Sequence, residues 1–336
     1  MTARWSLMSG LPELLLAGIL GITPELALEN TNIAGYDRTY RSADYNRIRA
    51  ELALSHEQYS NLAATLIVDN QTFCTTSPSL LDNEVSLYRA YGQYQGERHF
   101  WSVGRQRIPL GVGRIWNPID IFNPVNILAV ETDERTGTDS VRYEYALNEL
   151  SNLDLTVADG KAAARLKGYL EYADIGLVAL KDNNNDRNVY WGENTSLDIL
   201  GWELEGRLPG TGVELRSEGG RIHNRETGEV FSEFIFGAEY GFANSLTLLG
   251  EYRFSDQDMS DRLALQAGFQ PGMLWNCQVL LLTDLDDNSV LFAPSVTYSL
   301  SDEMTLSLGG FLSTGNATDA FPEDGNRCYL RWFVHF

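Results

Sequence analysis

The sequence has few cysteines and, after its first thirty residues, no long apolar segment. Its cysteines, Cys74, Cys277 and Cys328, are too few and too scattered for a disulfide framework, and no C-x-x-C spacing indicates zinc or covalent haem. Unpaired, they act as small apolar side chains; if any pair forms, Cys74 with Cys328 is favoured. No later apolar run approaches the roughly 18 residues of a membrane-spanning helix, so the sequence does not indicate a helical membrane protein.

Basic residues are also scarce. Lysine and arginine number 25 against 46 acidic residues, and the net charge of -21 argues against nucleic acid or an anionic membrane surface as the main partner. The four histidines, His56, His99, His223 and His335, are far apart and none has a metal-ligand spacing. We therefore expect no metal and no cofactor.

The first residues have the layout of a secretory signal. Arg4 precedes an apolar stretch, residues 7–22, and a small residue follows at Ala27. Glu13 and Glu25 interrupt this layout, so a misplaced start or an amphipathic helix stays open as an alternative. The division that we predict is a signal peptide over 1–28 and one β-barrel over 29–336.

Alternation of apolar and polar residues dominates the rest of the chain. Val141, Tyr143 and Tyr145 alternate with Arg142 and Glu144, and the same period of two recurs to the end of the chain. Short turns alternate with longer polar loops, which is the layout of an outer-membrane barrel. The sequence predicts an all-β protein, a transmembrane antiparallel up-and-down β-barrel of about 16 to 18 strands.

The polar strand faces carry charges of both signs. A soluble β-sandwich also alternates, with its apolar face inside, but mixed charges in strand after strand favour a water-filled lumen. The residues that we expect to face this lumen are Arg47, Arg49, Glu51, Arg142, Glu144, Arg165, Lys167, Glu205, Arg207, Glu251 and Arg253.

The chain closes on the apolar alternation Trp332, Val334 and Phe336. A terminal strand of this kind resembles the signal that the bacterial outer-membrane assembly machinery recognises on its clients. This resemblance implies a Gram-negative outer-membrane location and makes these three residues the candidate assembly signal.

The alternation fails over residues 104–140. A connection of this length is too long to be an ordinary turn and indicates a functional segment. Apolar residues such as Ile108 and Trp116 give it something to bury, while Pro109, Pro118 and Pro124 stiffen it. We predict that it folds inward against the barrel wall and narrows the channel.

Charged and polar residues within this segment are the candidate pore constriction: Arg105, Arg107, Arg114, Asn117, Asp120 and Asn123. Fixed charges at a narrow point set selectivity through their field. In the alternative interpretation, the arginines pair with Asp120 or with glutamates of the lumen and only hold the loop. Both alternatives stay open, and the sequence does not give the sign of ion preference.

The same segment carries a family resemblance. The run GRQRIPLGVGRIWNPIDIFNP, after a strand reading LYRAYGQYQGERHFWSVG, resembles bacterial outer-membrane porin-like barrels in which G-R-Q precedes an N-P-x-D-x-x-N-P loop. The motif match covers residues 87–124, and the rest agrees in barrel pattern only. The resemblance implies a channel for passive diffusion of small hydrophilic solutes or ions.

Other hypotheses remain. The barrel could be a sheath for a partner such as a periplasmic electron carrier, or an enzyme in which His99 acts with Ser102 or Ser86, although no G-x-S-x-G motif supports this. Acidic loops at 182–186, 256–261, 284–287 and 323–324 could bind divalent cations that bridge lipopolysaccharide, or they could simply be solvated. A homo-oligomer is also open.

Overall fold

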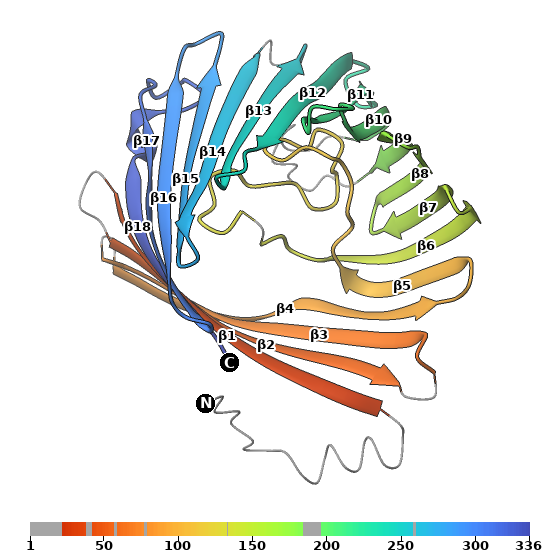
Figure 1. Cartoon of the computed structure of the whole chain (residues 1–336), viewed down its shortest axis with the longest axis horizontal. Coiled ribbons are helices and arrows are strands. Elements are labelled where there is room, and N and C mark those ends of the chain that lie inside the picture. Colours follow the sequence, from red (N-terminus) through yellow and green to blue (C-terminus); the bar gives the residue numbers. More distant parts are fainter. Residues whose placement is uncertain are drawn as a thin grey trace.

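The computed structural model describes residues 22–336 except 38–41, 57–58, 77–78, 133, 184–195 and 258–259. The described residues form one sheet of 18 antiparallel strands in which sequence neighbours pair, and β1 pairs with both β2 and β18. The sheet therefore closes into a barrel (Figure 1). The prediction of an all-β up-and-down barrel of about 16 to 18 strands is confirmed.

The strand bounds are β1 Ile22–Asp37, β2 Ser42–His56, β3 Leu62–Thr76, β4 Ser79–Gln95, β5 His99–Gln106, β6 Thr138–Asn148, β7 Ser151–Ala158, β8 Lys161–Tyr169, β9 Ala173–Asp182, β10 Leu197–Arg207, β11 Glu214–Asn224, β12 Val230–Gly241, β13 Leu246–Ser255, β14 Arg262–Gly272, β15 Trp275–Asp284, β16 Val290–Ser301, β17 Met304–Ser313 and β18 Arg327–His335. A single 3-10 turn, η1, spans Glu323–Gly325 within the described part. No helix in that part is long and apolar enough to cross a membrane.

The period-two pattern places apolar side chains on the outside of the barrel. Val103, Val141 and Val157 lie in register on three neighbouring strands, β5, β6 and β7. Their exposed fractions are 51%, 44% and 61%, because they point away from the lumen. An outward apolar face of this kind suits contact with hydrocarbon.

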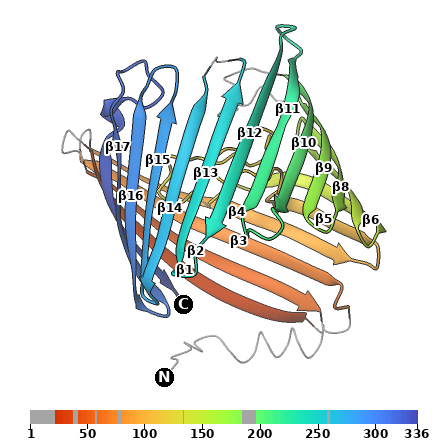
Figure 2. The same cartoon turned by 45° about the horizontal axis from the view of Figure 1, so that its top comes forward.

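The segment between β5 and β6, residues 107–137, runs inside the barrel (Figure 1) and lies within the ring of strands in the tilted view as well (Figure 2). Its apolar side chains pack in two clusters on the inner wall. Ile108, Ile119 and Phe122 meet wall residues that include Ile199 and Ile222. A second cluster joins Ile115 and Trp116 to Ile235, Leu249, Ala264, Leu282, Leu291 and Phe311.

The inner wall is therefore partly apolar, whereas we expected from the sequence that the charged strand faces enclose water. Among the described residues, the hydrophobic core lies between the loop and the inner face of strands β8–β17 and does not fill the rest of the lumen. Trp116 and Ile119 are 2% and 0% exposed. Burying each such side chain stabilises the seated loop by roughly 2 kcal/mol.

Two further expectations concern the chain ends and the cysteines. Residues 1–21 lie outside the described residues, while 22–28 already belong to β1 and pair with β2. The signal peptide and its boundary stay predictions.

All three cysteines are free, in line with the expectation that they are unpaired small apolar side chains. Cys74 on β3 and Cys328 on β18, the pair favoured if any formed, are separated by β1 and β2.

Candidate pore constriction

The first half of the loop is held by its main chain. Six consecutive backbone N–H groups, residues 111–116, donate hydrogen bonds to carboxylates of the barrel wall. Glu203 on β10 accepts from residue 111, and Glu218 on β11 accepts from residues 112 and 113, the latter at 2.8 Å. Glu251 on β13 accepts from residues 114, 115 and 116 at 3.0, 3.1 and 2.7 Å. We call these three residues the glutamate wall.

The glutamate wall is buried. Glu203, Glu218 and Glu251 are 2%, 0% and 1% exposed. A buried carboxylate is costly unless hydrogen bonds or opposite charges compensate it. Successive backbone N–H groups form a concave anion site, and the loop supplies such a site here. The wall and the loop therefore satisfy each other.

Two glycines allow this close approach. Gly111 has a φ of 80°, and a Cβ there would lie 2.4 Å from Oε2 of Glu218. A Cβ on Gly113 would lie 1.8 Å from the carbonyl oxygen of Trp116. Gly111 is thus required by the narrow space between the loop and Glu218 on the wall, and Gly113 by the tight turn of the loop on itself.

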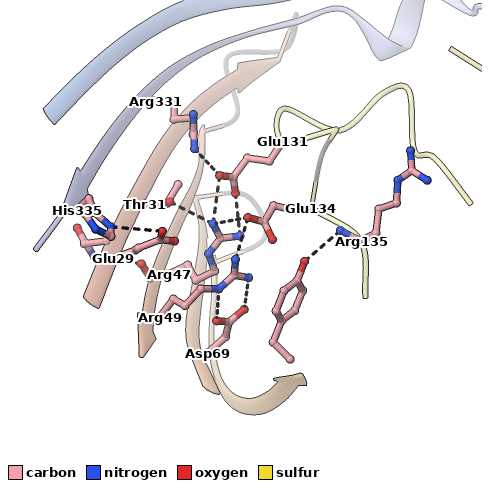
Figure 3. Close-up of polar contacts among 12 residues, drawn as sticks. Glu29, Thr31, Arg47, Arg49, Asp69, Glu131, Glu134, Arg135, Arg331 and His335 are labelled. Atoms are coloured by element: carbon pink, nitrogen blue, oxygen red, sulfur yellow. Dashed lines mark hydrogen bonds and ion pairs between the residues drawn. The ribbon is translucent and has the colours of Figure 1, made fainter. Parts of the chain in front are cut away.

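The end of the loop is held by side chains of opposite sign (Figure 3). Glu131 pairs with Arg47 on β2 at 3.0 Å and with Arg331 on β18 at 2.7 Å. Glu134 pairs with Arg49 at 2.9 Å, and Arg49 is itself held by two hydrogen bonds to Asp69 on β3. We call Arg47, Arg49 and Arg331 the arginine wall.

These pairs set the charge of the loop carboxylate. Burial alone would raise the pKa of Glu134, but the hydrogen bond from Arg49 and the charge of Arg47 outweigh it and hold that pKa below the ordinary value. Glu134 therefore stays charged under mildly acidic conditions, so the contact persists there.

The polar residues of the N-P-x-D-x-x-N-P motif organise the loop from within. Asn117, Asp120 and Asn123 are at most 3% exposed. An Asp120 carboxylate oxygen accepts the N–H groups of residues 122 and 123 at 3.1 and 2.8 Å. Asn123 accepts from the N–H of Ile108 at 2.7 Å and donates to the carbonyl oxygen of Thr136 at 2.5 Å, joining the two ends of the loop.

This placement differs from the prediction that the three motif residues line the constriction. Their polar atoms are used by the loop's own turns, as is common for Asn and Asp side chains that bond nearby backbone. Burial raises the pKa of Asp120 to about 6, although the two N–H groups and Arg135, at 3.4 Å, lower it in part.

The three candidate arginines fall in different places. Arg107 is exposed, and Arg114 keeps 54% of its side chain exposed while lying 3.5 Å from Glu205 and 3.9 Å from Glu239. Arg105 differs from the prediction, because it shares a face of β5 with the outward Trp101 and Val103. It forms a two-hydrogen-bond pair with Asp139 on β6 at 2.9 and 2.6 Å.

The residues expected to face the lumen occupy the inner positions of their strands. Buried ones hold the loop or its supports, as Arg165 does by donating to the carbonyl oxygen of Pro109 at 2.9 Å. Arg253 pairs with Glu233 at 2.6 Å, and Arg142 with Asp154 at 2.9 Å and with Glu144 at 2.5 Å. Those with more exposure are Glu51, Lys167, Glu205 and Arg207.

Sequence reasoning missed two groups of residues. Glu203 and Glu218 escaped notice as supports of the loop, since alternation cannot tell a carboxylate facing water from one facing backbone N–H groups. The inner apolar residues Ile199 and Leu282 were missed too. Their signal was present, since a strand buried on both faces has a continuous apolar run, as at 279–282.

The structure does not bring together the residues of the other candidate sites, the His99–Ser102 pair and the acidic loops, as far as these are described. His99 contacts the hydroxyl of Tyr143 at 2.8 Å, and Ser102 lies buried on the opposite face of β5. Of the acidic loops, 184–186 and Asp258 lie outside the described residues. Among the residues that are described, no group of three or more His, Cys, Asp or Glu side chains could hold a metal ion.

The described barrel resembles solved structures over nearly its whole length. Pseudomonas aeruginosa OccK11 (OpdR) matches with a TM-score of 0.63 at 11% identity, covering 94% of this chain and 96% of that one. Acinetobacter baumannii OccAB1 matches with a TM-score of 0.60 at 8% identity over 94% and 96%. A mutant of the Rh. blastica porin matches with a TM-score of 0.52 at 10% identity over 94% and 100%.

The fold is that of the bacterial porins. No family model and no curated protein matches the sequence. The resemblance drawn from the sequence is thus confirmed for the porin fold, while the identities of 8 to 11% carry no residue roles to this chain.

Proposed function

We propose that this protein is a bacterial outer-membrane channel through which small hydrophilic solutes or ions diffuse passively. The observation that carries the proposal is the seating of residues 107–137 across the lumen. The glutamate wall holds one part of the loop and the arginine wall holds the other. A loop fixed on two sides narrows a passage without needing to move, and the porin fold supports the same function.

The charge of the constriction comes from Arg107 and Arg114 in this proposal. Both lie on the seated loop with exposed side chains, and Arg114 faces Glu205 and Glu239. Mixed charges at close quarters favour hydrated polar solutes over apolar ones. Arg105, Asn117, Asp120 and Asn123 act as structural supports.

We also infer that the assembly machinery reads the end of β18. Trp332 and Phe336 are 48% and 69% exposed on the outer face, at the seam where β18 meets β1. The N–H of Phe336 donates to the carbonyl oxygen of Leu28 at 2.8 Å. The last residue therefore contributes to closing the barrel as well as to an exposed apolar edge.

Conductance of the purified protein in a planar bilayer tests the proposal. We expect stable steps of current from protein whose heat-dependent gel migration shows a folded barrel. The heat-denatured sample is the control and should give none. A folded barrel that conducts no ions would contradict a channel function.

A further inference from the structure

The outer wall carries an apolar hollow with a cationic end. Strands β7–β11 line a hollow of about 540 Å³ on the outward face. The space exists because Ala162, Ala164 and Ala179 occupy outward positions. Ala164 and Ala179 lie between Leu155 and Leu200 in one register row, and Ala162 pairs with Lys181 in the next outward row. Larger side chains at the alanine positions would fill it.

Three basic side chains line the end of the same hollow. Lys181, Arg221 and His223 are exposed and lie near the ends of β9 and β11. They are at the end of the barrel where the longer connections lie, opposite the short turns at 170–172 and 208–213. An apolar groove that leads to cations fits a molecule with an acyl chain and an anionic head.

Acidic neighbours do not cancel these charges. Asp198 also lines the hollow and lies 4.0 Å from His223, but Arg225 lies 3.4 Å from it and balances its charge, so Lys181 and Arg221 are the cations available to an anionic head. Arg221 is 3.9 Å from Asp256 and donates to Ser232 at 2.8 Å, with 59% of its side chain exposed. Within the part of the chain that the structure describes, Lys181 forms no ion pair.

We propose that this hollow binds one acyl chain of a phosphorylated glycolipid of the outer leaflet, with a phosphate on Lys181 and Arg221. Lipid A of lipopolysaccharide belongs to this class. The choice of leaflet rests on the proposed function, because it places the longer connections outside the cell. The alanine groove provides contact with the chain, and the two cations provide charge-assisted contact with the phosphate.

A second outward hollow is a natural control. Strands β12–β15 line about 450 Å³ around Ala238, Gly250 and Ala267. No basic side chain lines it among the described residues. It can take an apolar chain but offers nothing to a phosphate.

The test is lipid titration of the full chain in detergent, followed by native mass spectrometry. The probes are diphosphoryl lipid A, its dephosphorylated form and phosphatidylethanolamine. The variants are Ala164→Leu with Ala179→Leu, which fills the hollow, and Lys181→Ala with Arg221→Ala, which removes the cations. Ala267→Leu and Arg98→Ala are the matched controls, since Arg98 is exposed at a short turn. Heat-dependent gel migration verifies folding of each variant.

We expect lipid A to bind the unaltered protein more tightly than the other two probes. A basic residue near an anionic lipid contributes roughly fivefold in affinity, so the double cation variant should lose about 25-fold. The filled variant should bind lipid A about tenfold more weakly or worse, because it loses the contact of roughly two buried methylene groups. Both controls should bind lipid A as the unaltered protein does. Equal binding of dephosphorylated lipid or phosphatidylethanolamine, or unchanged lipid A binding in folded filled protein, would overturn the proposal.

Conductance of the same samples separates the two proposals. If the protein conducts but does not prefer lipid A, the lipid site is contradicted and the channel function stands. Protein that selects lipid A but does not conduct contradicts the channel and leaves the lipid site standing.

Discussion

Glu251 on β13 accepts the backbone N–H of Trp116 at 2.7 Å, and both side chains are buried. The wall therefore holds this part of the loop through its main chain. The side chain of Arg114 in the same segment stays exposed. The backbone of this short segment thus anchors the loop to the wall, while the side chain of Arg114 supplies its charge.

Replacing Glu251 by Ala should release the centre of the loop. Three backbone N–H groups would lose their acceptor, at a cost of about 3 kcal/mol or more. Hydrogen exchange of amides 114–116 should accelerate by roughly 100-fold, and single-channel conductance should rise. Glu214→Ala is the control, because Glu214 contacts Arg207 and Arg216 but not the loop. Unchanged exchange in the Glu251 variant would contradict the role of the glutamate wall.

Alanine at Gly111 should displace the loop, while alanine at Gly210 should not. The two glycines have φ of 80° and 76°, so the conformational penalty is similar, on the order of 1 kcal/mol. A Cβ at Gly111 meets Glu218 at 2.4 Å, whereas one at Gly210 meets no atom within 4 Å. Hydrogen exchange over residues 108–116 should rise in Gly111→Ala only. Equal effects in both variants would mean that space is not the cause.

Loop order should depend on the charge of Asp120. Burial raises its pKa from the ordinary 3.8 to about 6. A raised folded-state pKa means that the stabilising contribution is complete below pH 4 and is lost as the pH rises through 6. Exchange of amides 122 and 123, corrected for intrinsic rates, should therefore accelerate over this range.

Asp120→Asn supplies the comparison, since it keeps an acceptor oxygen but cannot ionise. The difference between the two proteins isolates Asp120 from other titrating groups, and Glu134 stays charged over most of this window because its pKa is lowered. The same pH slope in both proteins would exclude Asp120 as its source.

Arg107 and Arg114 should set ion preference, and Arg105 should not. Removing two positive charges from the seated loop lowers relative anion permeability, so the reversal potential in a salt gradient should move in the cation-selective direction. Arg105→Ala is the matched control, because that side chain pairs with Asp139 on the outward face of β5 and β6. A shift in the control with none in the double variant would contradict the assignment.

Deleting Phe336 should impair assembly. The truncation removes an exposed apolar side chain and the hydrogen bond to Leu28 at the seam of the barrel. The fraction of folded barrel in outer membranes, measured by heat-dependent migration, should fall, whereas Phe336→Tyr should retain it. Normal insertion of the truncated chain would count against the recognition signal.

Much of the fold could be predicted because the strand period is fixed by stereochemistry. The alternation at 141–145 alone shows which side chains share a face, and its recurrence gave the class of barrel and the strand number within two. The interruption at 104–140 was visible for the same reason, together with the apolar residues and prolines that made an inward position reasonable.

The supports of the loop could not be predicted from that pattern. Glu203 and Glu218 look like lumen carboxylates in the sequence, and only their burial against the N–H groups of residues 111 and 113 distinguishes them. The prediction for Arg105 was wrong because it ended the strand at residue 104 and assigned Arg105 to the loop. In the structure, β5 continues to Gln106, so Arg105 follows Val103 to the outside.

Glu131 has a consequence for the order in which the molecule assembles. Its two arginine partners are 84 and 200 residues away along the chain, on strands that flank β1 from either side. This carboxylate can meet both of them only once the last strand has joined the first. The contact of Glu131 with both arginines therefore depends on barrel closure, whereas the contacts of the glutamate wall, on β10, β11 and β13, do not involve the seam.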